Sequence, residues 1–305
     1  MTMRIASTQF SATMNTALQD NSVQLENILT KMASGQRFSL PSEDPIASVR
    51  LSRLSREVAS IDQYRDNIST LQSRLTQNEA YLTGMSNDML SARDLMVWAS
   101  DGSNTSADLA AMANSLQPII DSLFYTSNSK DAEGHYVFSG TATDTATLSY
   151  NSAAAVGSRY SFTGNTATQP VVVGAGVTQP ANITLPEMAT LLNQLDTALA
   201  TLQTPGVNVN VPAVHAQLAA ALDGLDTASN SISGKISGLG GIQNILKTLD
   251  SNHANVGLSN QQTALTLGQL DYSDAEVKLN GYTIAVQATQ KAYAQVSKLS
   301  LFDVL

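Results

Sequence analysis

The sequence predicts a mainly α-helical protein. We expect a long coiled-coil-like bundle built from both halves of the chain, a small inserted β domain, and terminal helices that form an assembly core. Apolar residues recur with 4-3 spacing in four stretches, as in helices that keep one seam toward a partner. Short β-prone runs between Gly, Asn and Thr interrupt the helices, and we assign residues 131–184 to the inserted β domain.

Composition excludes several classes of function. The chain has 305 residues, of which 13% are charged and 5% aromatic, against roughly 25% charged for an average soluble domain. Lys and Arg number 16 and Asp and Glu 25, so the net charge is −9, which argues against a nucleic-acid or anionic-membrane surface. The chain has no Cys, which excludes disulfides, thiolate metal sites and cysteine nucleophiles.

The amino-acid sequence gives no sign of membrane insertion. No segment approaches 18 consecutive apolar residues, and the first ten residues lack the apolar core of a cleaved signal peptide. A cytosolic protein is the default interpretation. The absence of Cys also fits a protein exported by a route that needs no cleaved signal.

Residues 44–130 form the N-terminal half of the predicted helical rod. Asp44 is suited to cap a long helix and Pro45 to begin it. The seam from Tyr64 to Met96 lies within this helix, which should run from Pro45 to near residue 101 and be roughly 80 Å long. A shorter helix should follow over about 106–129. We expect Trp98 to be a core aromatic near the helix end, with a binding anchor as the alternative. The seam residues expected in the rod core are Ile68, Leu71, Leu75 and Leu82.

Residues 185–254 form the C-terminal half of the rod, and their seam should pack against the first one as an internal core. Gly238, Gly240 and Gly241 interrupt this stretch at a cost of about 1 kcal/mol each relative to Ala. A close approach between helices is one reason for the chain to carry them. The core residues expected here are Leu222, Leu225, Ile232 and Ile236.

The two ends, residues 1–43 and 255–305, carry the same spacing with thinner apolar seams. Isolated helices of this size are marginal in water, so the two seams need each other or neighbours. An intramolecular core and pairing with other copies or other proteins both remain open at this point. The expected interface residues are Met14, Leu18, Leu25, Ile28, Met32, Leu279, Tyr282, Val286, Tyr293, Val296, Leu299 and Phe302.

Candidate catalytic and ligand-binding motifs fail on spacing. Gly-x-Gly at 174–176 and at 238–240 lacks the third Gly of a dinucleotide loop. His135, His215 and His253 lie far apart in sequence with no partner at metal-ligand spacing, so surface or packing roles are expected. We therefore expect no enzymatic activity, no metal and no cofactor.

Both ends of the chain carry distinctive motifs. Residues 32–38 read Met-Ala-Ser-Gly-Gln-Arg-Phe and residues 41–47 read Pro-Ser-Glu-Asp-Pro-Ile-Ala. This run resembles the N-terminal signature of the flagellin family, with Glu43 where the family usually has Asp. The ending Ser-Leu-Phe-Asp-Val-Leu is most similar to that of the hook-associated members at the hook-filament junction. Residues 130–140 resemble the entry into their β domain, with His135 in place of Arg. The family-motif residues are Ser34, Gly35, Arg37, Pro41, Ser42, Asp44, Pro45, Ser300 and Leu301.

This resemblance implies a structural adaptor of the bacterial flagellum, located at the hook-filament junction. It implies export unfolded through the flagellar type III apparatus and assembly as a ring. The implied partners are other copies of the chain, the adjacent hook-associated protein, flagellin, and an export chaperone at the C-terminal helix, with no nucleic acid and no membrane. The alternatives are a filament subunit, that is flagellin itself, and a cytosolic coiled-coil binding module.

Overall fold

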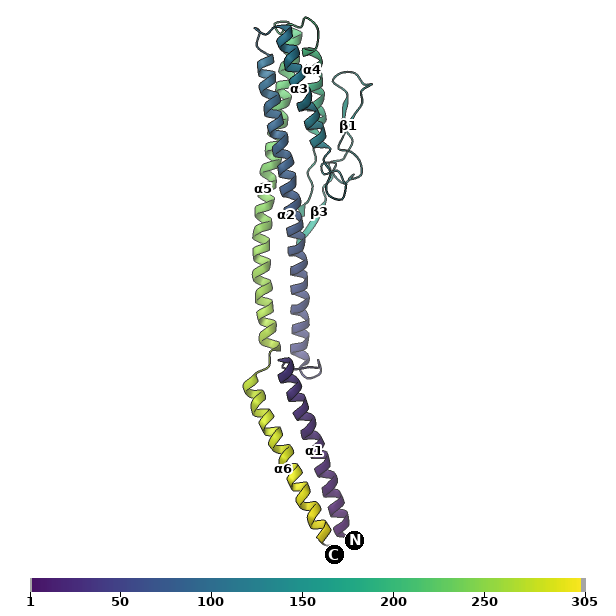
Figure 1. The fold of residues 1–305 in the computed structure, drawn as a ribbon, viewed down its shortest axis with the longest axis vertical. Coiled ribbons are helices and arrows are strands. Elements are labelled where there is room, and N and C mark those ends of the chain that lie inside the picture. Colours follow the sequence, from purple (N-terminus) through teal and green to yellow (C-terminus); the bar gives the residue numbers. More distant parts are fainter. Residues whose placement is uncertain (1, 303–305) are drawn as a thin grey trace. The chain divides into compact units, whose positions relative to one another are not determined.

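The computed structural model describes residues 2–302, with side chains described for residues 9–295, and its helices follow one another as Figure 1 shows. The described chain is mainly helical with two small antiparallel sheets, which confirms the predicted fold class. It divides into two compact units: residues up to 60 together with those from 255 onward, here the terminal unit, and residues 61–254, here the rod unit. The helices are α1 (Thr2–Ser34), α2 (Pro45–Ala99), α3 (Ser106–Ser127), α4 (Glu187–Leu202), α5 (Pro212–Gly268) and α6 (Tyr272–Phe302).

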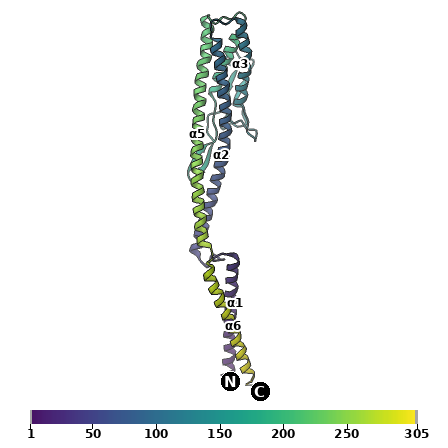
Figure 2. The same cartoon turned by 60° about the vertical axis from the view of Figure 1, so that its left-hand side comes forward.

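Helices α2 and α5 run side by side through the rod unit in both views (Figures 1 and 2). Their apolar seams share one core, in which Leu222 and Ile236 are half-buried and the other expected rod residues are buried. Polar side chains join the two helices at three levels. The Arg65 Nε lies 2.8 Å from the Asp250 carboxylate, the Gln243 amide donates to Glu79 at 2.9 Å, and the Arg93 Nε lies 2.7 Å from Asp226. The fully or nearly buried rod residues from the predicted set are Ile68, Leu71, Leu75, Leu82, Leu225 and Ile232.

Helices α3 and α4 complete the bundle at the end where α2 stops. Helix α3 begins with a capping box, in which the Thr105 hydroxyl accepts from the Asp108 amide while the Asp108 carboxylate accepts from the Thr105 amide. Helix α4 contacts α5 through Glu187, which pairs with Lys235 and accepts from the Ser231 hydroxyl. Leucines and alanines on α3 and α4 extend the same core that α2 and α5 form.

The glycines in the middle of α5 do not mark a close helix approach, so that expectation is wrong within this chain. A Cβ added at Gly238, Gly240 or Gly241 would meet no atom within 4 Å. The close approach occurs instead at Gly224, where a Cβ would lie 1.9 Å from the Oε1 of Gln194 on α4. The difference arises because the three central glycines face away from the buried seam of α5.

The inserted segment has no core of its own. Strands β1 (Leu148–Tyr150) and β2 (Tyr160–Phe162) pair in one hairpin, and β3 (Pro170–Gly174) and β4 (Val177–Pro180) in another. Residues 131–147 form turns and isolated bridges where the sequence suggests short strands. Phe138, from that stretch, is fully buried and its ring packs edge-on against Tyr81 of α2 at 6.1 Å. The insert therefore belongs to the same compact unit as the helices.

Side chains of the bundle hold both hairpins by their backbones. The Asn193 side chain on α4 accepts from the Tyr160 amide at 2.9 Å and donates to the Tyr160 carbonyl at 2.8 Å. The second hairpin is bound by Asn67, which donates to the Val172 carbonyl at 2.8 Å, and by His253, whose Nε2 lies 2.9 Å from the Val173 carbonyl oxygen. The hairpins thus lie along the helices at fixed positions.

Truncating a seam residue should destabilise the rod unit far more than truncating an exposed leucine of the same helix. Leu82 is 0% exposed, so Leu82→Ala should lower the free energy of unfolding by about 2–5 kcal/mol. Leu90 is 52% exposed, and Leu90→Ala serves as the matched control, with an expected change within about 0.5 kcal/mol. Urea denaturation followed by circular dichroism measures both changes. Equal effects of the two substitutions would contradict the core assignment.

Replacing a central glycine of α5 should stabilise the helix. Because an added Cβ at Gly238 meets nothing, Gly238→Ala should raise the free energy of unfolding by about 0.5–1 kcal/mol. Gly224→Ala is the control, and it should gain less because the Gln194 side chain must move aside. The same denaturation measurement tests this, and a loss of stability in Gly238→Ala would show that the solvent-facing assignment is wrong.

Candidate assembly surface

The terminal unit pairs α1 with α6 over a very small core. Ile28, Leu270 and Ala275 are buried together, with Leu25 and Met32 packed against them. Leu279 and Tyr282 extend this cluster from α6. Among described side chains, none in residues 9–27 or 276–295 is buried. The pair is therefore held at the end where α1 stops and α6 starts, and its farther portions leave their seams open.

The predicted interface residues follow this gradient. Ile28 is buried, and Tyr293, at 41%, is exposed. Val296, Leu299 and Phe302, and the motif residues Ser300 and Leu301, lie outside the side chains that the structure describes. The remaining predicted residues are half-buried: Met14, Leu18, Leu25, Met32, Leu279, Tyr282 and Val286.

The terminal unit also exposes large apolar side chains that the seam analysis did not identify. Ile46 and Val49 are 71% and 67% exposed on the first turns of α2, and Val277 is 71% exposed on α6. They escaped the pattern because a 4-3 repeat identifies one face of a helix, and these residues lie on other faces. Large apolar side chains exposed in this number are typical of a surface that a partner covers. The exposed apolar residues of the unit are Phe10, Val23, Leu29, Leu40, Ile46, Val49, Val256, Leu258, Leu265, Tyr272, Val277, Ile284 and Tyr293.

The connector, residues 35–44 between α1 and α2, is fastened by its backbone to the segment between α5 and α6. Gly35 ends α1 with a φ of +68°, a conformation that glycine adopts without strain. The Leu270 amide donates to the Gly35 carbonyl at 2.9 Å, and the Arg37 amide donates to the Gly268 carbonyl at 2.8 Å. The Tyr272 hydroxyl adds a bond to the Met32 carbonyl at 3.1 Å. The family-motif residue Gly35 thus links the end of α1 to the segment that precedes α6.

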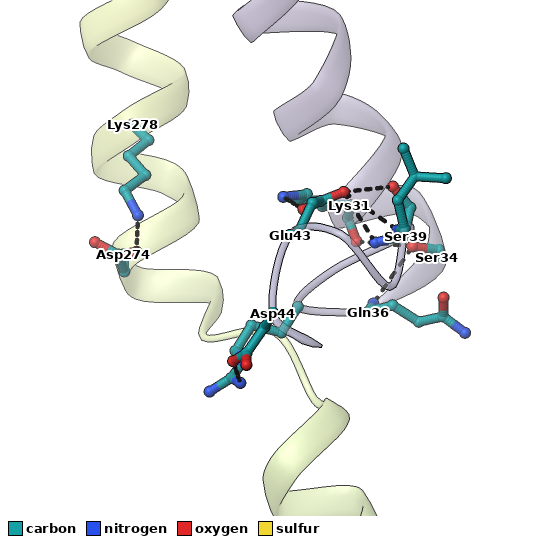
Figure 3. A network of polar contacts seen from close by, with 10 residues as sticks. Lys31, Ser34, Gln36, Ser39, Glu43, Asp44, Asp274 and Lys278 are labelled. Carbon is teal, nitrogen blue, oxygen red and sulfur yellow. Dashed lines mark hydrogen bonds and ion pairs between the residues drawn. The ribbon is translucent and has the colours of Figure 1, made fainter. Parts of the chain in front are cut away.

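Ion pairs stabilise the connector from within, as Figure 3 shows. Lys31 pairs with Glu43, and Arg37 pairs with Asp44. Asp44 also caps α2, because its carboxylate accepts from the Ala47 amide at 2.9 Å, as the sequence predicts. Of the other motif residues, Ser34, Pro41, Ser42 and Pro45 are exposed, and Pro41 lines a groove.

Glu43 holds the connector through its carboxylate. The ion-paired hydrogen bond from Lys31 is the main cause that lowers the pKa of Glu43 from its ordinary 4.5 to about 2. The Ser39 hydroxyl donates to the same carboxylate at 3.0 Å, and the amides of Ser39 and Leu40 donate at 3.3 Å each. All of these bonds favour the charged form, which burial alone would disfavour. Glu43, the residue that departs from the usual family motif, therefore makes more contacts than the motif suggests.

An open apolar groove of about 930 Å³ lies in the terminal unit between the connector and the last turns of α5. Phe38, Pro41 and Leu51 line one side, and Leu265 and Gly268 line the other. No local sequence pattern indicates this groove, because its lining comes from two stretches, residues 34–51 and 261–269, that are distant in sequence.

The net charge of the chain is confined to one unit. The rod unit contains 7 basic and 16 acidic residues, a net charge of −9, whereas the terminal unit contains 9 of each and is neutral. The terminal unit is thus neutral, has a small core and exposes many large apolar side chains, which suits a surface that other subunits cover. The charged residues are visible in the sequence, but their uneven distribution appears only once the boundaries of the two units are known.

Trp98 lies on the surface of the rod unit, so its expected place in the core is wrong. Its side chain is 70% exposed, whereas Met96 and Ala99 fill the seam at 0% exposure. Two residues beyond Met96, the helix has turned by about 200°, which directs Trp98 away from the core. Trp98 therefore fits the alternative, a residue available to a partner.

The described residues show no arrangement suited to metal binding. No group of three or more His, Asp or Glu side chains lies close enough to hold an ion in that part of the chain. His253 contacts a hairpin carbonyl and the Tyr64 ring, His135 lies 3.9 Å from Asp131 and 3.7 Å from Asp144, and His215 is exposed. None of the described helices combines the length and hydropathy that crossing a membrane requires.

The sequence and the fold of this chain are similar to those of known flagellar proteins. Residues 5–143 match the family model for the bacterial flagellin N-terminal helical region. Flagellar hook-associated protein 3 of Escherichia coli (strain K12) is 29% identical over 288 residues, which is 90% of each chain. The structure of a flagellar hook-associated protein from Vibrio parahaemolyticus is 33% identical, with a TM-score of 0.67, and covers 74% of this chain and 99% of its own. The flagellar junction protein of Legionella pneumophila, 14% identical with a TM-score of 0.55 over 71% of this chain and 100% of its own, shares the fold.

The paired terminal helices and the flagellin N-terminal match define a protein of the flagellin class. Within that class, the chain belongs to the family of flagellar hook-associated proteins. It is a structural component of the bacterial flagellum. The resemblance noted in the sequence is thereby confirmed.

The ordering effect of Glu43 should depend on pH in a defined window. Because the folded pKa is lowered, the stabilisation is complete above the ordinary pKa of 4.5 and is lost as the pH falls through about 2. At pH 6, the amide hydrogens of Ser39 and Leu40 should therefore exchange several-fold faster in the Glu43→Gln variant than in the unsubstituted chain. The difference should shrink below pH 4 and vanish only well below pH 2. Protection factors from hydrogen exchange measure this.

Glu57→Gln provides the control for Glu43→Gln. Glu57 is exposed on α2, and within the described residues its side chain makes no hydrogen bond to the connector. Its substitution should leave the connector amides unchanged at every pH. A Glu43→Gln difference that stayed undiminished from pH 6 to pH 2 would mean that the carboxylate charge is not the cause.

Proposed function

We propose that this protein is a structural adaptor that joins the hook-associated zone of the flagellum to the flagellin filament. It is exported unfolded through the flagellar type III apparatus and assembles as a ring at the junction. The observation that carries the proposal is the unfinished core of the terminal unit, where two long helices pair yet bury side chains at one end only. Such helices gain their stability when neighbouring subunits cover them.

The proposed partners are other copies of this chain, the adjacent hook-associated protein and flagellin. Ring assembly needs heterologous contacts, in which different surfaces of successive subunits meet. The half-buried seam of α6, and the apolar residues exposed on both terminal helices, support partners that are themselves helical and apolar. An export chaperone at the C-terminal helix would cover the same seam before secretion.

The similarity to flagellar hook-associated protein 3 over 90% of both chains supports the junction role over that of a bulk filament subunit. A cytosolic binding module would not need membership of an exported flagellar family. We further propose that the protein has no catalytic activity, since the described side chains form a packing and assembly surface.

Proteolysis of the purified chain tests the physical basis of the proposal. In dilute solution, protease should first cut residues 1–60 and 255–305 and leave a resistant fragment that contains the rod unit. In isolated flagella the same terminal segments should resist digestion, because neighbours cover them. Termini that resist protease in a monodisperse monomer would contradict an assembly-dependent core.

A cell-level experiment tests the place of the protein in the flagellum. Cells that lack it should build hooks, export flagellin and shed that flagellin unassembled into the medium. Restoring the full chain should restore filaments. Normal filaments in its absence would overturn the adaptor role, and self-polymerisation of the purified chain into long filaments would favour a filament subunit.

A further inference from the structure

Three arginines form an exposed basic stripe on the first turns of α2, within the terminal unit. Arg50, Arg53 and Arg56 are three residues apart, so each side chain follows the last by about 4.5 Å of rise and all lie within about a third of the helix circumference. All three are exposed. Among the described residues, none of their side chains makes an ion pair or a hydrogen bond. We call these three residues the arginine stripe.

The carboxylates of the terminal unit near the connector already have partners. Glu43 pairs with Lys31 and Asp44 with Arg37, while Asp274 on α6 pairs with Lys278. Among the described residues, Glu57, four positions after Arg53 on α2, is a carboxylate without an ion pair, so one free negative charge stands on the helix beside the three guanidinium groups. A guanidinium covered in an assembly without a partner would carry a large desolvation cost.

The rod unit, unlike the neutral terminal unit, has a large excess of acidic residues. Four of its basic residues are paired, and its 16 acidic residues outnumber all 7 of its basic ones. Several of its exposed carboxylates make no ion pair within the described residues. These carboxylates are Asp62, Asp66, Asp94 and Asp223.

We propose that in the assembled flagellum the arginine stripe of one subunit contacts the acidic rod unit of a second copy of this chain. This inference rests on the proposed ring assembly. The charge complementarity selects the partner, because each copy carries both the unpaired basic stripe and the acidic unit. A contact between two different surfaces of identical chains repeats from subunit to subunit, which is what a ring requires.

Zero-length cross-linking tests the contact. In a variant with Arg50→Lys, Arg53→Lys and Arg56→Lys the charge remains, and a carbodiimide can join each lysine amine to a touching carboxylate as an amide, with loss of water. Two versions with different epitope tags are produced in one strain, flagella are isolated, and dimers that carry both tags are analysed by mass spectrometry. The expected products join positions 50, 53 or 56 of one copy to carboxylates within residues 61–254 of the other.

The control variant places three lysines on another side of the same helix, as Ser52→Lys, Ser55→Lys and Ala59→Lys, all at exposed positions. It should give several-fold fewer two-tag dimers through its new lysines. Equal yields from both variants, or stripe cross-links that reach only flagellin or only the same chain, would overturn the inference while the adaptor role stands. Absence of the unsubstituted protein from isolated flagella would instead contradict the proposed function.

Discussion

The small core between α1 and α6 is the constraint on which the rest of the terminal unit depends. Burial of Ile28, Leu270 and Ala275 fixes the two helices at one end, and their remaining length contributes surface that has no partner in the chain. Hydrophobic stabilisation scales with the apolar area removed from water, so a helix pair of this kind is weak alone and strong when covered. The location of that core determines which part of each helix remains exposed for contact with other subunits.

The connector explains why the core lies where it does. Gly35 turns the chain at the end of α1, and two backbone hydrogen bonds fasten the connector to Gly268, at the end of α5, and to Leu270, between α5 and α6. Backbone bonds hold position irrespective of nearby side chains, while Glu43 and Asp44 add charge-dependent order. Residues that are distant in sequence thereby hold α1 and α6 together at the connector, and the motif at 34–45 has a structural reason.

Much of this architecture could be predicted from periodicity and capping. The seam through Ile68 and Leu82 and the cap at Asp44 are local patterns, and local patterns determine local structure. The prediction that Trp98 is buried was wrong because it rested on the aromatic residue type. The angular position of Trp98 relative to the buried Met96 directs its side chain to the surface. The burial of Phe138 against Tyr81 depends on a contact between residues 57 positions apart, which no local pattern records.

The way the hairpins are attached has a consequence for how freely the insert can vary. Asn67, His253 and Asn193 bind backbone groups of the hairpins, and the buried side chains of Leu148, Tyr160 and Val173 pack into the core, so sequence variation is confined to the exposed positions of the insert. The tip of the second hairpin, at Gly176, has open space around it. That segment can therefore diverge in sequence, or accept an inserted peptide label, while its place along the bundle is preserved.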